Sequence, residues 1–166
     1  MPVALTLRLS EETAAPVLAL ADRFGPRPDY PPHVTLAILQ GDETESVAVA
    51  AAARLAAGWS AQPLSLAGLG LFPGPPAVLF LLPVVTPLLL ARHGELLALL
   101  PEAALHPHSR SDAWVPHVTL AADLVDPAAA FGRLGALPLP LPALLDRLEV
   151  IRFPPARILA TRTLRG

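Results

Sequence analysis

The chain of 166 residues contains no cysteine and no lysine. Without cysteine it has no disulfide, no thiol nucleophile and no thiolate ligand for a metal. Without lysine it has no amine for a Schiff base and no Walker-type lysine to hold a phosphate. All twelve basic residues are therefore arginine, a bias that, together with abundant alanine, proline and leucine, indicates GC-rich coding more than function.

Charged residues are also scarce, at 16% of the chain, whereas hydrophobic residues make up 53%. The net charge of −2 argues against binding to long duplex nucleic acid, because sequence-independent binding needs a basic surface. The most apolar stretch, residues 75–91, is short for a membrane span and is interrupted by Pro83 and Pro87. Since the first residues show no basic region or cleavage site of a signal peptide, we expect a cytoplasmic protein. The low charge would permit a dimer, but we expect a monomer.

Against this background, six residues occur twice. The stretch Pro32–Ala37 reads Pro-His-Val-Thr-Leu-Ala, and Pro116–Ala121 repeats it. Valine, threonine and leucine favour a strand, and a proline at the first residue of a strand removes no hydrogen bond from the ladder. We therefore predict strands over His33–Leu39 and His117–Asp123.

Side chains alternate between the two faces of a strand, so each repeat has one chemical face and one apolar face. His33 and Thr35 share a face of the first strand, and His117 and Thr119 share a face of the second. If the two faces were turned towards each other, two imidazoles and two hydroxyls would surround one cavity. One imidazole could act as a base and the other as an acid, while the hydroxyls donate to phosphate oxygens. This arrangement is suited to phosphoryl transfer without a metal.

Both halves of the chain show the order strand, helix, His-x-Thr strand, helix, strand. Outside the two motif strands, the predicted strands of the first half are Val3–Leu9 and Leu64–Phe72, and those of the second half are Val78–Val84, Leu145–Phe153 and Ile158–Leu164. The predicted helices run from Ser10 to about residue 24, from Asp42 to Ala57, from Thr86 to about Leu100, and from Asp126 to about Leu134. The alternation of strands and helices by itself would also allow a parallel sheet.

Helix-capping residues occur at matching places in the two halves. Ser10 and Thr86 precede the first helix of each half, and Asp42 and Asp126 follow the two motif strands. Asp42, with Glu45 three residues later, resembles a capping box. These matches support an internal duplication.

The segment Pro73–Pro76 is the strongest chain breaker, and we place a boundary there. We predict a single bilobal domain over residues 1–166, with one lobe over about residues 1–74 and the other over about 75–166. The loop Pro101–Ala113 has no counterpart of equal length in the first half.

The two His-x-Thr strands, each entered from a proline, resemble the 2H phosphoesterase superfamily, which includes the bacterial 2′-5′ RNA ligase-like RNA 2′,3′-cyclic phosphodiesterases. The resemblance covers essentially the whole chain. It implies an α+β fold of two pseudo-symmetric lobes with mainly antiparallel sheets around a central cleft, each lobe carrying one His-x-Thr strand.

The resemblance also implies a reaction. His33 and His117 would be the acid–base pair, and Thr35 and Thr119 would hold the phosphate. The substrate would be a 2′,3′-cyclic phosphate at the end of an RNA or a nucleotide, the product a 2′-phosphate, and no metal or cofactor would be needed. Reversible 2′-5′ RNA ligation is a related activity. The family precedent favours His117 as the residue that activates water and His33 as the acid.

The sequence departs from the family pattern in two places. Many bacterial members continue the first motif with Phe-Leu-Gly, where this chain has Ala37–Gly41, and many carry an arginine soon after the second motif, where it has Ala121–Asp123. Another small cyclic phosphodiester, such as an ADP-ribose cyclic phosphate, is therefore an alternative substrate. A non-catalytic module that binds RNA or nucleotides is the second alternative.

Other candidate substrate contacts are supported by weaker sequence patterns. Tyr30 and Trp114 each stand three residues before a motif histidine and could stack on a base or pack between the lobes. Arg110 in the long loop could meet a phosphate, and Arg152 and Arg157 flank the final hairpin.

Three further histidines have weak patterns. His106 and His108, with Asp112, have a loose metal-ligand spacing, but there is no His-Glu-x-x-His pattern, and we expect no metal. His93 is expected at the surface or rim of its helix.

Overall fold

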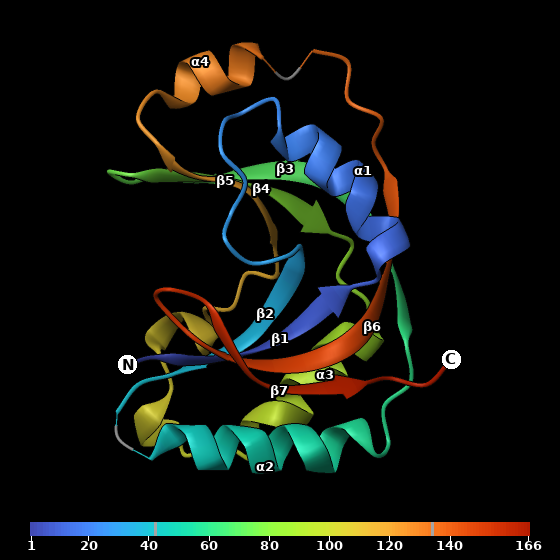
Figure 1. Cartoon of the computed structure of the whole chain (residues 1–166), viewed down its shortest axis with the longest axis vertical. Helices are drawn as coiled ribbons and strands as arrows, with labels where there is room; N and C mark the ends of the chain where they lie inside the picture. The colour runs from blue at the N-terminus through green and yellow to red at the C-terminus, as the bar shows by residue number, and fades with distance from the viewer. Residues whose placement is uncertain (42, 134) are drawn as a thin grey trace.

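The computed structural model describes residues 1–41, 43–133 and 135–166. The seven strands are β1 (Val3–Leu9), β2 (His33–Leu39), β3 (Gln62–Phe72), β4 (Ala77–Pro83), β5 (Val118–Leu124), β6 (Leu141–Arg152) and β7 (Arg157–Thr163) (Figure 1). The helices are α1 (Glu11–Ala21), α2 (Thr44–Ala56), α3 (Pro87–Leu97) and α4 (Pro127–Gly132), with two short 3-10 helices, η1 (Glu102–Ala104) and η2 (Pro107–Ser109). None of the described helices is long and apolar enough to cross a membrane.

All strand pairs are antiparallel, in the order β2-β1-β6-β3-β4-β5, with β7 beside β6. The predicted α+β fold with antiparallel strands is therefore confirmed, and the parallel alternative is wrong. The order is symmetric about its centre, because β2, β1 and β6 occupy the same places on one side as β5, β4 and β3 on the other. The duplication inferred from the sequence is thus visible in the sheet.

The two parts of the sheet do not follow the predicted division at residue 74. β6 comes from the second half of the chain but pairs with β1, and β3 comes from the first half but pairs with β4. A cut at residue 74 would separate β3 from β4. Figure 1 shows β1, β2, β6 and β7 in its lower part, next to α2 and α3, and β3, β4 and β5 in its upper part, next to α1 and α4.

Strand length explains this exchange. β3 and β6 have 11 and 12 residues, whereas each of the other strands has 7. The first residues of β3 and β6 pair with each other, Gln62–Leu66 against Leu141–Leu145, and their later residues pair with β4 and β1. The two long strands therefore join the two parts of the molecule, so that each part combines segments from both halves of the sequence.

Three of the predicted helix caps are confirmed. The side chains of Ser10, Thr86 and Asp126 accept hydrogen bonds from backbone N–H groups three residues later, and Pro87 and Pro127 each stand at the start of a helix. These residues start α1, α3 and α4 where the sequence predicts.

α1 and α3 end earlier than predicted, at Ala21 and Leu97, and two further helix boundaries adjoin residues outside the described part of the chain. Asp42 lies outside the described residues, and α2 begins at Thr44 after Glu43, whose φ is 61°. Thr44 Oγ1 donates to the carbonyl of Gly41. The predicted end of the last helix, Leu134, is also outside the described residues, and α4 ends at Gly132.

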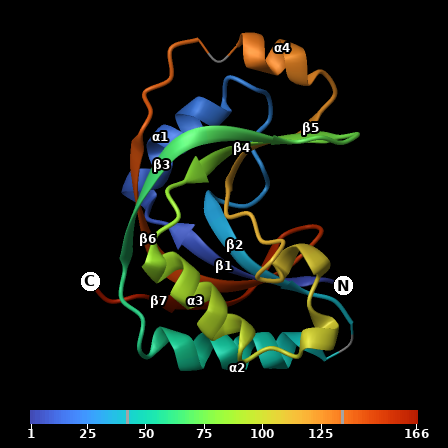
Figure 2. The same cartoon turned by 180° about the vertical axis from the view of Figure 1, so that it is seen from behind.

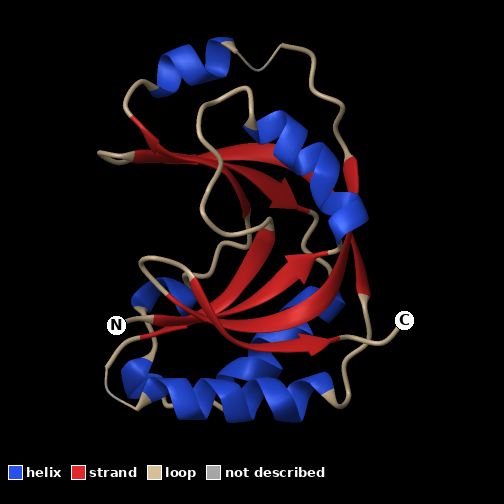
Figure 3. Ribbon diagram, in the orientation of Figure 1, coloured by secondary structure: helices blue, strands red, loops and turns tan. Residues whose placement is uncertain are grey.

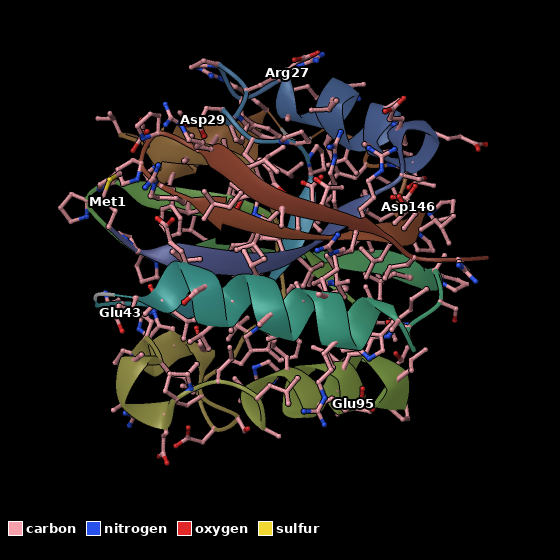
Figure 4. The ribbon with its side chains drawn as sticks, turned by 60° about the horizontal axis from the view of Figure 1, so that its bottom comes forward. Met1, Arg27, Asp29, Glu43, Glu95 and Asp146 are labelled. Atoms are coloured by element: carbon pink, nitrogen blue, oxygen red, sulfur yellow. The ribbon has the colours of Figure 1, made fainter. Side chains whose placement is uncertain are left out.

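Helices cover one face of each part of the sheet. α2 contacts β1, β6 and β7, and α3 contacts β2, while α1 contacts β5 and β6. Figure 3 shows the helices on the outside of the strands, and Figure 4 looks onto α2 with α3, marked by Glu95, beside it. In the two motif strands the apolar side chains are buried, which leaves the opposite face for chemistry.

The loop 101–113 lies along the free edge of β2. His106 N donates to the carbonyl of Ile38, Gln40 N donates to the carbonyl of Ala104, and Ile38 N donates to Ser109 Oγ. The loop thus pairs with backbone N–H and C=O groups of an edge strand that would otherwise be exposed (Figure 2). This fixes η1 and η2 beside the first His-x-Thr strand.

Candidate active site

The two His-x-Thr strands occupy opposite ends of the strand order, yet they contact each other. His33 opens β2, and His117 immediately precedes β5. In both motifs the valine and leucine are fully buried, whereas the histidine and threonine are only partly buried. The alternation predicted from the sequence is therefore present in both strands, and His33 lies close enough to His117 for their charges to interact.

Each motif strand carries a β-bulge at the same place. Thr6 pairs with Thr35 and Leu5 with Ala37, so Leu36 is the extra residue of β2. In β5 the extra residue is Leu120, since Phe80 pairs with Thr119 and Leu79 with Ala121. A bulge bends a strand and redirects its side chains. Both strands therefore turn just after the threonine of the motif.

Both histidines are held in the same way. His33 Nδ1 lies 2.7 Å from the carbonyl oxygen of Pro31, and His117 Nδ1 lies 2.8 Å from that of Val115. Because a carbonyl only accepts, Nδ1 carries the hydrogen in each ring. Nε2 is then the nitrogen that can take or release a proton.

Both histidines are neutral near pH 7 in the free protein. The pKa of His33 is lowered to about 4, mainly by burial and to a smaller extent by the charge of His117, while the Pro31 carbonyl and Glu149 act in the opposite direction. Burial also lowers the pKa of His117, against the effect of the Val115 carbonyl. A neutral imidazole is ready to act as a base, whereas an acid must first gain a proton that a bound anion would stabilise.

Polar groups surround His33. The ring of Tyr30 meets it edge-on, with centroids 4.7 Å apart. The Tyr30 hydroxyl donates to the buried carboxylate of Glu149, which also accepts from Arg8 at 3.3 Å. Thr6 completes the group, with its Oγ1 3.0 Å from the Tyr30 hydroxyl.

Aromatic carbon surrounds His117 instead. The ring centroids of Phe72 and Phe80 lie 4.9 Å and 5.0 Å from the imidazole. Phe80 lies over Gly70, where an added Cβ would collide with the ring. Gly70 therefore makes room for this aromatic pair, a role consistent with the close approach that a glycine in a strand indicates.

A cavity of about 570 Å³ reaches Thr35 and His117. Its other walls come from the end of β3, from β2 and from the loop before β5: Ile38, Phe72, Pro73, His106, His108, Ser109, Ala113, Trp114 and Val115. A larger hollow of about 670 Å³, next to α4, contains neither motif histidine. The mixture of apolar walls and a few polar groups is typical of a site for a small organic ligand.

Trp114 is a fixed wall of this cavity. Its indole N–H donates to the carbonyl of Thr35 at 2.9 Å, and its ring stacks on His93 with centroids 3.9 Å apart and planes 7° apart. His93 is 3% exposed and lies 3.0 Å from the Ser109 carbonyl, so the prediction that it is a surface or rim residue is wrong. Buried between α3 and the loop, His93 supports Trp114.

The remaining predicted contact residues do not line the cavity. Tyr30 is 7% exposed and packs with Ala4 and Ile151. Arg110 is exposed and does not line the cavity, and Arg152 pairs with Glu45 on α2 at 2.9 Å.

Arg157 and Asp112 are exposed. Of the three residues with metal-ligand spacing, His106 and His108 line the cavity, with ring centroids 4.9 Å apart. Within residues 1–41, 43–133 and 135–166, no three potential ligands gather to hold a metal ion.

Sequence reasoning missed Glu149 and the phenylalanine pair. Glu149 has a recognisable signal, because it is an acidic residue flanked by Leu148 and Val150 in a strand with a buried apolar face. Phe72 and Phe80 have none, since aromatic residues in strands are usually core.

Comparison with known proteins agrees with this geometry. The model of the 2′-5′ RNA ligase superfamily matches residues 8–154. Among curated proteins, none matches the sequence significantly.

Several solved structures share the fold. E. coli LigT complexed with 3′-AMP aligns with a TM-score of 0.70 and 18% identity over 100% of both chains. The protein TT0787 of Thermus thermophilus aligns with a TM-score of 0.68 and 25% identity over 100% of this chain and 99% of its own. Kluyveromyces marxianus Usb1 aligns with a TM-score of 0.56 and 17% identity over 98% of each chain. With the repeated His-x-Thr strands and the family match over most of its length, the chain belongs to the 2′-5′ RNA ligase superfamily, a group of 2H phosphoesterases.

Proposed function

We propose that the protein hydrolyses 2′,3′-cyclic phosphates at the ends of RNA or nucleotides to 2′-phosphates, with two histidines and no metal. The observation that carries the proposal is the paired geometry of the motifs. His33 and His117 come from contacting strands, and each has Nδ1 bonded to a carbonyl and Nε2 left for proton transfer. Thr35 and Thr119 stand beside them on the same faces as phosphate donors.

In this mechanism His117 Nε2 takes a proton from a water molecule, whose oxygen attacks phosphorus. Negative charge grows on the non-bridging oxygens, and the hydroxyls of Thr35 and Thr119 donate to them. The bond from phosphorus to the ribose 3′ oxygen breaks, and His33 Nε2 delivers its proton to that oxygen. The 2′-phosphate leaves, and solvent returns a proton to His33 and removes one from His117. The same path, with the 5′ hydroxyl of a second RNA in place of water as the nucleophile, would form a 2′-5′ linkage, and its reverse would cleave one.

The unequal surroundings of the histidines support these roles. The phenylalanine rings beside His117 exclude water and stabilise a positive charge only through their π-faces. This environment favours a neutral imidazole, which can act as a base. Glu149 near His33 favours an imidazolium. The negative charge of the bound phosphodiester adds to this effect and would allow His33 to hold the proton it must donate.

The cavity supports a nucleoside next to the phosphate. Trp114 and Phe72 present aromatic surface within one cavity that reaches Thr35 and His117. E. coli LigT is known in complex with 3′-AMP, and K. marxianus Usb1 with uridine monophosphate. We propose that this cavity takes the base and ribose of a comparable nucleotide, with Trp114 as the stacking surface.

A smaller substrate is the second candidate, favoured by the absence of arginine from the described cavity walls. An RNA chain presents several phosphates, for which arginine is the usual partner. The walls carry His106 and His108 instead, and Arg110 lies outside them. We therefore propose a cyclic mononucleotide or an ADP-ribose cyclic phosphate as the second candidate substrate.

The test is turnover of the four nucleoside 2′,3′-cyclic monophosphates and of a short RNA with a cyclic end, with and without EDTA. We expect activity that survives EDTA, yields the 2′-phosphate and is lost in His33→Ala and His117→Ala. A higher kcat/KM for mononucleotides than for RNA would favour the small substrate. If no compound is turned over but nucleotides bind equally to the protein and to both variants, the chain is a binding module and the hydrolase proposal is wrong.

A further inference from the structure

A row of polar side chains crosses the lower part of the sheet at the level of the first motif. Thr35 on β2 pairs with Thr6 on β1, Thr6 with Glu149 on β6, and Glu149 with Thr161 on β7. Residues paired directly across neighbouring strands lie on the same face. The carboxylate of Glu149 therefore lies on the face of the sheet that carries the His33 side chain.

Glu149 is 1% exposed, yet it makes three polar contacts. Its oxygens accept from the Tyr30 hydroxyl, from Thr161 Oγ1 at 3.1 Å and from Arg8 Nη1 at 3.3 Å. Burial of a carboxylate without donors is very costly, and three donors, one of them a cation, offset that cost. The carboxylate is thus a fixed negative charge inside the protein.

Tyr30 links this charge to His33. Its single hydroxyl hydrogen is donated to Glu149, so Thr6 must be the donor in the contact between Thr6 and Tyr30. Burial and the neighbouring Glu149 raise the pKa of Tyr30, so it stays a neutral donor. With the hydroxyl fixed at Glu149, the ring edge is fixed against the imidazole of His33.

The equivalent places around His117, on β4 and β3, hold different residues. Thr119 pairs with Phe80, and Phe80 pairs with Gly70, so the places of Thr6 and Glu149 are taken by an aromatic ring and a glycine. The difference arises within a duplicated frame that holds both histidines identically at Nδ1. The acidic network is therefore specific to one histidine and is not a general requirement of the fold.

We propose that Glu149, held by Tyr30, Thr161 and Arg8, is the positioning residue that makes His33 the proton donor of the reaction. The buried carboxylate stabilises the imidazolium, and Tyr30 fixes the plane of the ring. This inference rests on the proposed function, whose acid it explains.

Two other charged groups face His33. His117 approaches from β5 and opposes its protonation. Arg8 is paired with His33 across β1 and β2, and a cation on the same face disfavours a second positive charge nearby. The Arg8 side chain is 18% exposed and the Glu149 side chain 1%, so water screens the cation more than the anion. The net effect of the pair at His33 is therefore negative.

The experiment compares Glu149→Gln with Arg8→Gln, because both keep a hydrogen-bonding side chain and remove one charge of opposite sign. In the first readout, NMR follows the His33 ring without substrate. We expect the midpoint of the His33 titration to lie about one pH unit lower in Glu149→Gln than in the parent protein, and to lie higher in Arg8→Gln.

The second readout is the pH profile of kcat, which reports the protonation states of the enzyme–substrate complex. The alkaline limb, which reports the proton on His33, should move to lower pH in Glu149→Gln and to higher pH in Arg8→Gln, with the acidic limb unchanged. Glu149→Asp, which keeps the charge, should restore most of the parent profile. Glu45→Gln is the matched control, since it removes a carboxylate paired with Arg152 on α2 and should move neither limb.

The outcomes are separable. If His33 protonation is the same in Glu149→Gln, Arg8→Gln and the parent, the proposal is wrong whatever the activity. If Glu149→Gln moves the acidic limb instead, Glu149 acts on the histidine that is the base, and the assignment of His33 as the acid is wrong. If Glu149→Gln does not fold, Arg8→Gln decides alone. If the His33 titration shifts as expected but no cyclic phosphate is turned over, the proposed function fails while the electrostatic coupling stands.

Discussion

His33 and His117 occupy equivalent positions in two repeated strands, but their neighbours are of different kinds. His33 lies beside Tyr30 and the charged pair of Glu149 and Arg8, while His117 lies between two phenylalanine rings. A duplicated frame therefore holds two identical side chains, both with lowered pKa, in different surroundings, and a buried carboxylate lies near His33 while aromatic rings flank His117. The motif identifies the reacting groups. The residues on neighbouring strands determine which histidine acts as the acid and which as the base.

The largest expected effect comes from removing either histidine. His33→Ala and His117→Ala should each lower kcat by on the order of 10²- to 10⁴-fold. If the comparison is right, the residual pH profiles differ, because His117→Ala loses the acidic limb and His33→Ala loses the alkaline limb. Steady-state kinetics across the acidic and alkaline limbs measures this. The reverse pattern would exchange the two roles.

Unlike the histidines, the two threonines should have equal effects on the reaction, since both donate to the same phosphate. Thr35→Val and Thr119→Val keep the side-chain shape and remove one donor, and each should lower kcat by about 10²-fold. The measurement is kcat at the optimal pH for each variant. Thr163→Val, on exposed β7, is the control and should change kcat little. A loss in only one of the two motif variants would show that the phosphate is held by a single lobe.

Gly70→Ala tests the aromatic side of the comparison. Its Cβ would collide with the Phe80 ring, so Phe80, which contacts His117, must shift. We expect a loss of about 1–3 kcal/mol in the free energy of unfolding, together with a lower kcat. Gly68→Ala, in the same strand, meets Leu82 at an ordinary 3.6 Å and serves as the matched control. Chemical denaturation that ranks Gly68→Ala as the more damaging change would contradict the packing described here.

The smallest expected effect is the pH dependence of stability. The ordinary pKa of histidine is 6.5, and burial lowers that of His33 to about 4 in the folded protein. Between these values the unfolded chain binds more protons, so this contribution to stability is complete above pH 6.5 and declines as the pH falls towards 4. Between about pH 7.5 and about pH 5, the parent should lose about 2 kcal/mol that His33→Gln does not lose. Equal losses in urea unfolding would show that His33 is more hydrated than the structure indicates.

Much of the local structure could be predicted from the chain. Ser10, Thr86 and Asp126 are helix caps, and the alternation in both motifs places histidine and threonine opposite buried valine and leucine. These features depend on neighbours within a few residues, which propensity and periodicity describe well. The predicted lobe boundary at residue 74 is wrong because turn residues indicate where a strand ends but do not indicate which strand pairs with it.

The sequence by itself determined the reacting groups, the duplicated order of elements, and the absence of thiol and amine chemistry. Only the tertiary structure decided that β3 and β6 exchange partners, that loop 101–113 and His93 build the wall carrying Trp114, and that Glu149 lies behind His33 while Gly70 takes the equivalent place near His117. The physical reason is the sequence separation of the interacting residues. Caps and strand faces are set by residues close in the chain, whereas the electrostatic environment of His33 is set by a carboxylate far away in the sequence, brought near by strand pairing.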